Sequence, residues 1–232
     1  MASKDRGVRI FLRVRPTKKP SGYFKFSDED GCKVDFNVPL EQIHGHVNNT
    51  RQNFKFKFNG LLDMKATQEE VFDTVAKPSI QNALNGFNST IFAYGQTGSG
   101  KTFTITGGPE HYVDRGIIPR TLSHCFQMFA ENPDRTYTMH ISYLEIYNEE
   151  IRDLLGKDPK HKLDLKENID SGVYVKDLTS FVVKSVGEID QVMQAGKKNR
   201  STGATLMNQT SSRSHSIFTI TVETAETGED GE

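Results

Sequence analysis

The chain has 232 residues and a formal net charge of −1 at pH 7, with 35% hydrophobic and 25% charged residues. These values are typical of a soluble globular chain of one large or two small domains, and they exclude an extended disordered one. A net charge near zero argues against general nucleic-acid binding. The apolar runs are too short to span a membrane, and no apolar stretch follows the polar N-terminal residues as it does in a signal peptide. We therefore expect neither a nucleic-acid nor a membrane partner.

The chain contains two cysteines, Cys32 and Cys125, and they form no C-x-x-C or Cys/His cluster. This pattern predicts a reducing compartment, without a disulfide framework or a zinc site.

The N-terminal third predicts short strands and one helix. Alternating apolar residues favour a strand over 7–14 and small antiparallel strands within 21–58. Thr67-Gln68-Glu69-Glu70 is a capping box that opens a helix, and Gly86 is a suitable stop. Pro78 falls inside this helical pattern and is expected to kink it.

A phosphate-binding loop follows the apolar, strand-like run Thr90–Tyr94. It reads Gly95-Gln96-Thr97-Gly98-Ser99-Gly100-Lys101-Thr102 and fits the pattern G-x-x-x-x-G-K-[ST]. Its glycines let the backbone direct several N–H groups at one phosphate, and the following helix adds its partial positive N-terminus. We expect Lys101 to reach the β- and γ-phosphates and the Thr102 hydroxyl to bind Mg²⁺.

The remaining elements alternate in the manner of an α/β protein. Helices are expected from Pro119 and after the capping box Ser185–Glu188, and strands over 137–147 and 217–222. The last ten residues, 223–232, are acidic and contain glycines, which favours a surface loop.

A second motif, Asn208-Gln209-Thr210-Ser211-Ser212-Arg213-Ser214-His215, precedes the final expected strand. Hydroxyl groups beside a guanidinium are suited to sensing a γ-phosphate and the water shell of Mg²⁺. Taken alone, the motif is better explained as a solvated serine-rich turn, but the phosphate loop in the same chain favours the phosphate-sensing role.

Four segments together resemble the kinesin motor domain, in the order and spacing of that family: 13–16 (Arg-Val-Arg-Pro), 92–102, 142–149 and 208–215. The resemblance runs from about Val8 to Val222. It implies a single partial motor domain over 1–232, with residues 7–222 as the family-like core and 223–232 as a loop or truncated end. The implied fold is the α/β P-loop NTPase fold of kinesin motors, with a mixed, mainly parallel central sheet, helices on both faces and an incomplete C-terminus.

The resemblance also implies roles for single residues. Arg13 and Pro16 would pack on the adenine with Phe103 on its other side, and Arg15 would also lie at the nucleotide. The family often has histidine at the position of Phe103, so stacking is retained here without that polar contact. The phosphates would be held by Gly95, Gln96, Thr97, Gly98, Ser99, Gly100, Lys101 and Thr102. The implied catalytic residues are Lys101, Asn208, Ser211, Ser212 and Arg213.

Within that catalytic set, the resemblance makes Ser211 and Ser212 the first switch, which meets the γ-phosphate and Mg²⁺. Asn208 would help place the attacking water, and Arg213 would pair with a carboxylate of the second switch. Thr102 and Ser212 would be the metal contacts.

The implied function is ATP-driven movement along microtubules, with ATP and Mg²⁺ as cofactors and tubulin as partner. Residues 43–131 look like the kinesin-9 group and residues 142–218 more like the kinesin-2 group. Both groups are ciliary, so the expected location is the cytoplasmic cytoskeleton, including the axoneme of a cilium or flagellum. A non-motile nucleotide-binding or regulatory protein is the alternative, and a phosphoryl-transfer enzyme on a small substrate is a weaker one.

The family's second switch, D-x-x-G followed by a glutamate, does not occur after the strand expected at 217–222. We therefore expect residues 1–232 alone to hydrolyse ATP poorly and to be marginally stable, because half of a phosphoryl-transfer gate and a central strand are missing. The oligomeric state would be set by a stalk that is also absent.

Three polar residues and two basic runs remain. Glu145, Asn148 and Glu149 are expected to stabilise a strand end and turn rather than act as acids or bases. The basic run 156–162 suits an acidic partner such as tubulin or is a solvated loop, whereas 197–200 is expected to be structural, near the nucleotide.

Overall fold

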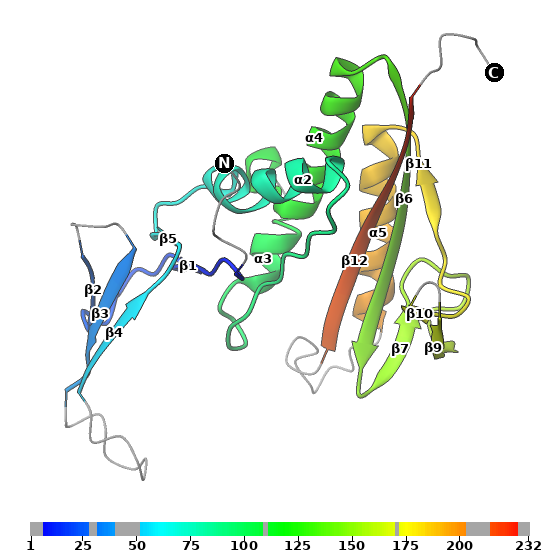
Figure 1. The fold of residues 1–232 in the computed structure, drawn as a ribbon. Coiled ribbons are helices and arrows are strands. Elements are labelled where there is room, and N and C mark those ends of the chain that lie inside the picture. The colour runs from blue at the N-terminus through cyan, green and yellow to red at the C-terminus, as the bar shows by residue number, and fades with distance from the viewer. Residues whose placement is uncertain are drawn as a thin grey trace. The chain divides into compact units, whose positions relative to one another are not determined.

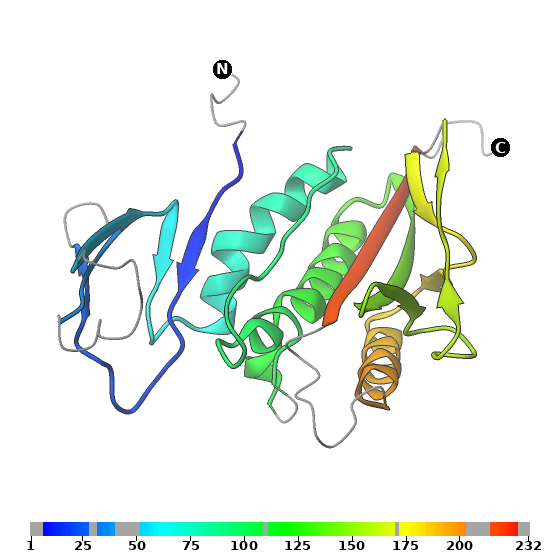
Figure 2. The same cartoon turned by 90° about the horizontal axis from the view of Figure 1, so that it is seen from below.

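The computed structural model describes residues 7–27, 32–39, 52–108, 111–169, 172–202 and 214–226. The chain divides into two compact units, Met1–Val71 and Phe72–Glu232. Figures 1 and 2 show the elements of both units in two perpendicular views. Within the described ranges, no helix is long and apolar enough to cross a membrane.

The first unit contains two small sheets. β1 (Phe11–Arg13) pairs in parallel with β5 (Gly60–Leu62). A separate antiparallel sheet has the order β2-β3-β4, with the bounds Phe24–Ser27, Lys33–Asn37 and Asn53–Lys57. The small antiparallel strands expected within 21–58 are therefore confirmed. The strand expected over 7–14 is shorter than predicted, because its partner β5 offers only three residues for pairing.

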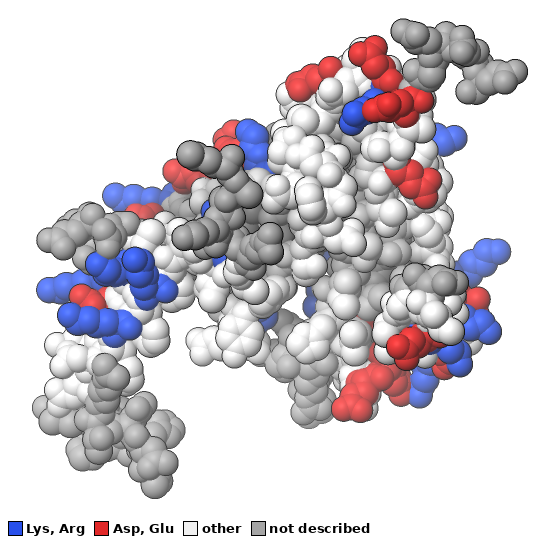
Figure 3. All heavy atoms as spheres, viewed as in Figure 1, with Lys and Arg blue, Asp and Glu red and all other residues white. Residues whose placement is uncertain are grey.

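The β2-β3-β4 sheet has one aromatic face and one charged face. The register places Phe36 between Phe24 and Phe54, and the centroids of the Phe24 and Phe36 rings are 5.9 Å apart. Because side chains alternate between faces, the residues between these positions point the opposite way. That opposite face carries Lys25, Lys33, Asp35, Lys55 and Lys57. Figure 3 shows lysine and arginine side chains gathered over these strands, at the left of the view.

The capping box before α1 (Gln68–Val71) forms as predicted. The Thr67 N–H donates to Glu70 Oε2 at 2.7 Å, and the Glu70 N–H donates to Thr67 Oγ1 at 3.1 Å. Two N–H groups of the first turn, which have no partner inside the helix, are satisfied in this way.

Replacing Thr67 with alanine is expected to lower the free energy of unfolding by about 1 kcal/mol, because the cap on the Glu70 N–H is lost. Urea denaturation followed by circular dichroism measures the change. Thr224→Ala, at an exposed position of the last strand, is the matched control and should stay within about 0.5 kcal/mol. Equal losses in the two variants would mean that the cap adds nothing specific.

The helix that follows in the second unit is interrupted as expected near Pro78. A π-helical turn, η2 (Phe72–Ala76), precedes α2 (Lys77–Leu84), in which Pro78 lies in the first turn. Because proline has no N–H and clashes with the carbonyl four residues earlier, a wider turn at this point relieves the conflict. α2 ends at Leu84, two residues before the predicted stop at Gly86.

A five-stranded sheet with the path β11-β6-β7-β8 forms the centre of the second unit. β12 pairs with β6 along the other edge, over thirteen residues from Ser214–Tyr147 to Glu226–Arg135. A separate hairpin joins β9 to β10. The bounds are Arg135–Tyr147 (β6), Glu150–Asp153 (β7), Lys162–Leu163 (β8), Leu165–Asn168 (β9), Gly172–Val175 (β10), Phe181–Val183 (β11) and Ser214–Glu226 (β12).

Three strand expectations need correction. The expected sheet is mainly parallel, but among the described strands only β1 and β5 pair in parallel. β6, β7 and β8 follow one another in the chain and pair as antiparallel neighbours. The run Thr90–Tyr94 forms no strand within the described part of the chain. Residues 223–226, the first four of the run expected to be an acidic surface loop, belong to β12, since each has a partner on β6.

Helices α4 (Ile117–Glu131) and α5 (Val186–Thr202) cover one face of β6. Phe129 of α4 stacks on Tyr137 with ring centroids 4.2 Å apart, and Gly196 of α5 lies directly against the Tyr143 ring. Tyr137 and Tyr143 share a face of the strand, so both helices pack on the same side. The buried residues Leu122, Met139, Ile141, Leu154 and Ile189 form the core there. The expectation of helices on both faces is not confirmed for this sheet, because the contacts of the described residues place α4 and α5 on the same face.

The two cysteines are free and differ in burial. Cys125 lies in α4 with 3% of its surface exposed, and burial raises the pKa of its thiol to about 11. We expect iodoacetamide at pH 8 to label Cys32 at least roughly a hundredfold faster, because thiolate is the nucleophile and access to Cys125 requires opening of the core. Mass spectrometry of a labelling time course measures both rates. Similar rates would contradict the packing of α4 against the sheet.

Candidate nucleotide site

The backbone of the loop Gly95–Thr102 is shaped for close approach of a ligand. Gly100, which immediately precedes α3 (Lys101–Ile105), has φ +100°, a conformation that residues with a Cβ rarely adopt. A Cβ atom on Gly95 would lie 2.6 Å from Ser99 Oγ, so only glycine fits at this end of the loop. The Ser99 N–H donates to the Gln96 carbonyl at 3.1 Å and closes the turn between them. Glycine at both positions thus adds no side chain between the loop backbone and a ligand.

The Lys101 side chain folds back over this loop. Its ammonium group donates to the carbonyls of Gly95 at 2.7 Å and Gln96 at 2.9 Å. These contacts place a positive charge inside the curve of the loop, where the sequence pattern predicts the β- and γ-phosphates. Among the described residues this half-buried ammonium bonds to neutral carbonyls, which makes it a good partner for an anion, because charge-assisted hydrogen bonds are stronger than neutral ones. The residues present therefore fit a bound triphosphate.

The helix after the loop is shorter than the loop pattern suggests. α3 has five residues and ends at Ile105, so its dipole is small, and Lys101 and the loop N–H groups supply most of the positive potential. Within the described residues the Thr102 hydroxyl makes no hydrogen bond, whereas the hydroxyls of Thr104 and Thr106 donate to helix carbonyls. The Thr102 hydroxyl is thus available to Mg²⁺, as the loop pattern predicts.

The predicted adenine contacts fall in different units. Arg13, at the end of β1, and the exposed Arg15 and Pro16 belong to the first unit. Phe103 belongs to α3 in the second unit and is 41% exposed. Their joint contact with an adenine remains a prediction.

The motif 208–215 lies largely outside the described residues. Asn208, Ser211, Ser212 and Arg213 are among the residues that are not described. Ser214 and His215 are the first residues of β12, opposite Tyr147 and Ile146 of β6. The motif therefore leads directly into the longest strand pair of the second unit.

A buried ion pair lies beside the start of β12. Glu145 of β6 is 3% exposed, and Arg200 Nε of α5 donates to its Oε1 at 3.3 Å. Arg200 Nη2 also donates to Ser214 Oγ at 3.2 Å. One guanidinium thus joins a helix and two strands. Sequence reasoning placed Arg200 near the nucleotide and Glu145 at a strand end, but no local pattern indicates that they meet across 55 positions.

Asn148 and Glu149 have a structural role, as expected. They form the two-residue connection between β6 and β7 with φ +50° and +63°, the positive values of a tight hairpin turn. Their side chains have no part in a site that the described residues form.

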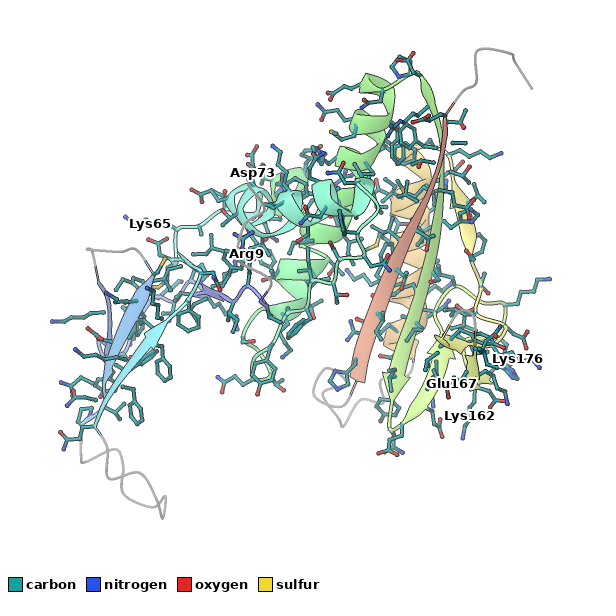
Figure 4. All side chains as sticks on the ribbon, in the orientation of Figure 1. Arg9, Lys65, Asp73, Lys162, Glu167 and Lys176 are labelled. Atoms are coloured by element: carbon teal, nitrogen blue, oxygen red, sulfur yellow. The ribbon has the colours of Figure 1, made fainter. Side chains whose placement is uncertain are left out.

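The basic run 156–162 is partly neutralised by nearby carboxylates. Lys162 bonds to Glu150, and this contact, followed by one from Arg152, holds the pKa of Glu150 below its usual value. Figure 4 shows Lys162 of β8, Glu167 of β9 and Lys176, which follows β10, in the same region of the second unit. The second basic run, 197–200, is part of α5 and supplies Arg200. The structural role expected for 197–200 agrees with that contact.

Comparisons with known proteins identify the family of the chain. A family model described as the kinesin motor domain matches residues 13–232. The kinesin-like protein KIF3C from Bos taurus is 48% identical over 177 residues, which cover 76% of this chain and 22% of that protein. KIF3C from Mus musculus is 49% identical over the same length. The chain thus spans about a fifth of the length of these curated relatives.

A solved structure is also similar. It is described as a fast kinesin, with implications for ATPase mechanism and interactions with microtubules, and it superposes with a TM-score of 0.83 at 36% sequence identity. The match covers 97% of this chain and 62% of that one. The mixed α/β arrangement, the Gly95–Thr102 loop and the matching segments lead to one conclusion: the chain belongs to the kinesin motor domain family.

Proposed function

We propose that this chain is the nucleotide-binding part of an ATP-driven microtubule motor. The observation that carries the proposal is the Gly95–Thr102 loop, in which the Lys101 ammonium lies against the Gly95 and Gln96 carbonyls. Family membership supports ATP as the nucleotide and the microtubule as the track.

In this proposal the loop N–H groups and Lys101 bind and orient the phosphates, and Thr102 holds Mg²⁺ together with Ser212. The metal would neutralise charge on the phosphates when bound. Lys101 would leave the loop carbonyls for phosphate oxygens, so that the ammonium exchanges neutral acceptors for charged ones. The remaining assignments, Asn208 for the water, Ser211 and Arg213 for the switch, and Arg13, Arg15, Pro16 and Phe103 for the base, rest on the family resemblance.

Phosphate release by the full-length protein, measured with and without microtubules, tests the motor function. A motor is expected to release phosphate faster when microtubules are added. A non-motile nucleotide-binding protein, the alternative, would instead show a higher melting temperature with Mg-ATP and phosphate release at background. Release that is independent of microtubules would contradict the choice of track.

We extend the proposal to the microtubules of a cilium or flagellum. The likeness of residues 142–218 to the kinesin-2 group and the KIF3C relatives supports it. Fluorescent tagging of the protein in ciliated cells of its source tests it, and exclusion from the axoneme would overturn it.

A further inference from the structure

A buried glutamine contacts one of the proposed adenine-binding residues inside the first unit. Arg13 Nη1 donates to Gln68 Oε1 at 2.9 Å. Arg13 ends β1, whereas Gln68 opens α1, 55 positions later in the chain. Both residues belong to the compact unit Met1–Val71.

Gln68 is held firmly at this position. Its side chain is 5% exposed, and buried amides need hydrogen-bond partners. The reciprocal capping bonds between Thr67 and Glu70 fix the first turn of α1, and with it the direction of the Gln68 side chain. Because arginine only donates, its contact also identifies the amide oxygen of Gln68 as the atom that faces Arg13.

This contact constrains the plane of the guanidinium. Arg13 is half-buried, and desolvation lowers the pKa of its side chain. A guanidinium stacks flat groups on its face and donates hydrogen bonds to acceptors at its edge, so the bond at one edge constrains the orientation of the face. A leucine at position 68 would keep the volume and remove this acceptor, and with it the constraint that the bond places on the Arg13 guanidinium.

We propose that Gln68 is a positioning residue for recognition of the nucleotide base. It acts through Arg13, and it contributes to the part of the affinity that depends on the base and not to the part that depends on the phosphates. This inference rests on the proposed nucleotide-binding function. Gln68 lies 27 positions before Gly95, the first residue of the phosphate loop, and belongs to none of the nucleotide motifs.

Binding of two ligands to Gln68→Leu tests the inference. Calorimetry with chain 1–232 would measure the dissociation constants of Mg-ATP and of magnesium tripolyphosphate, which has the phosphates but no base. We expect Gln68→Leu to weaken Mg-ATP about five- to twentyfold, at or below the lower end of the effect of losing a hydrogen bond to a charged group, because the effect reaches the base only through Arg13. The same variant should change tripolyphosphate binding less than about twofold. Gln68→Glu, which keeps an acceptor for Arg13, should restore most of the ATP affinity.

Gln127→Leu is the matched control, because Gln127 is exposed on α4 and bonds to Glu131 of the same helix. It should bind both ligands as the unchanged chain does. The double variant Arg13→Met/Gln68→Leu should bind Mg-ATP no more weakly than Arg13→Met alone, since the proposal has Gln68 affect the base through Arg13.

Three outcomes would overturn the inference: unchanged Mg-ATP affinity in Gln68→Leu, equal weakening of both ligands, or additive losses in the double variant. Equal weakening would show that Gln68 only stabilises the fold. Failure of the unchanged chain to bind Mg-ATP and tripolyphosphate would be a different result, because it would overturn the proposed function itself.

Discussion

Replacing Lys101 with alanine is expected to weaken Mg-ATP binding by roughly 30- to 1000-fold. The ammonium group donates two short bonds within the loop, to Gly95 and Gln96, and both are free to move to phosphate oxygens. Loss of one or two charge-assisted hydrogen bonds costs about 2–4 kcal/mol, which corresponds to that range. A titration with a fluorescent ATP analogue measures the change.

Lys77→Ala is the control for this prediction. Lys77 is an exposed lysine of α2, paired at 3.4 Å with Asp73 one turn earlier, and its loss removes the same charge far from the loop in sequence. Its nucleotide affinity should stay within about twofold of the unchanged chain. Similar losses in both variants would mean that overall charge, and not the position of Lys101, determines binding.

The second large effect is expected from Glu145→Gln. The carboxylate is 95% buried as a side chain and pairs with Arg200, whose side chain is 21% exposed. Removing one partner of a buried pair leaves the other charge uncompensated, and we expect a loss of about 2–4 kcal/mol in the free energy of unfolding. The lower end reflects the partial exposure of Arg200. Urea denaturation followed by circular dichroism measures the loss.

Two further variants separate the buried charge from other causes. Glu226→Gln breaks an exposed pair with Arg135 and should cost less than about 1 kcal/mol. The double variant Glu145→Leu/Arg200→Met removes both charges and should recover part of the stability lost in Glu145→Gln. A double variant that is less stable than Glu145→Gln would show that the hydrogen bond of Arg200 to Ser214 matters more than the ion pair.

Local features were predictable from the sequence. The capping box of Thr67 and Glu70 and the turn at Asn148 and Glu149 depend on residues a few positions apart, and all form in the structure. The loop Gly95–Thr102 was predictable for the same reason, since its pattern is contained in eight residues.

Features that depend on distant partners were not predictable. The apolar run Thr90–Tyr94 has the composition of a buried strand, yet Phe92 is 72% and Tyr94 94% exposed, because a strand also needs a neighbour to pair with. The contacts of Arg13 with Gln68 and of Glu145 with Arg200 each join residues 55 positions apart. A single sequence shows that these side chains are polar but not which of them meet in the core.

Calorimetric titration of Mg-ATP into chain 1–232 tests the central claim most directly, because that claim concerns one loop and one ligand. We predict saturable binding of one nucleotide per chain, retained in Lys77→Ala and lost or strongly weakened in Lys101→Ala. Absence of binding by the folded, unchanged chain, or undiminished binding by Lys101→Ala, would contradict the account of Gly95–Thr102 as the nucleotide site.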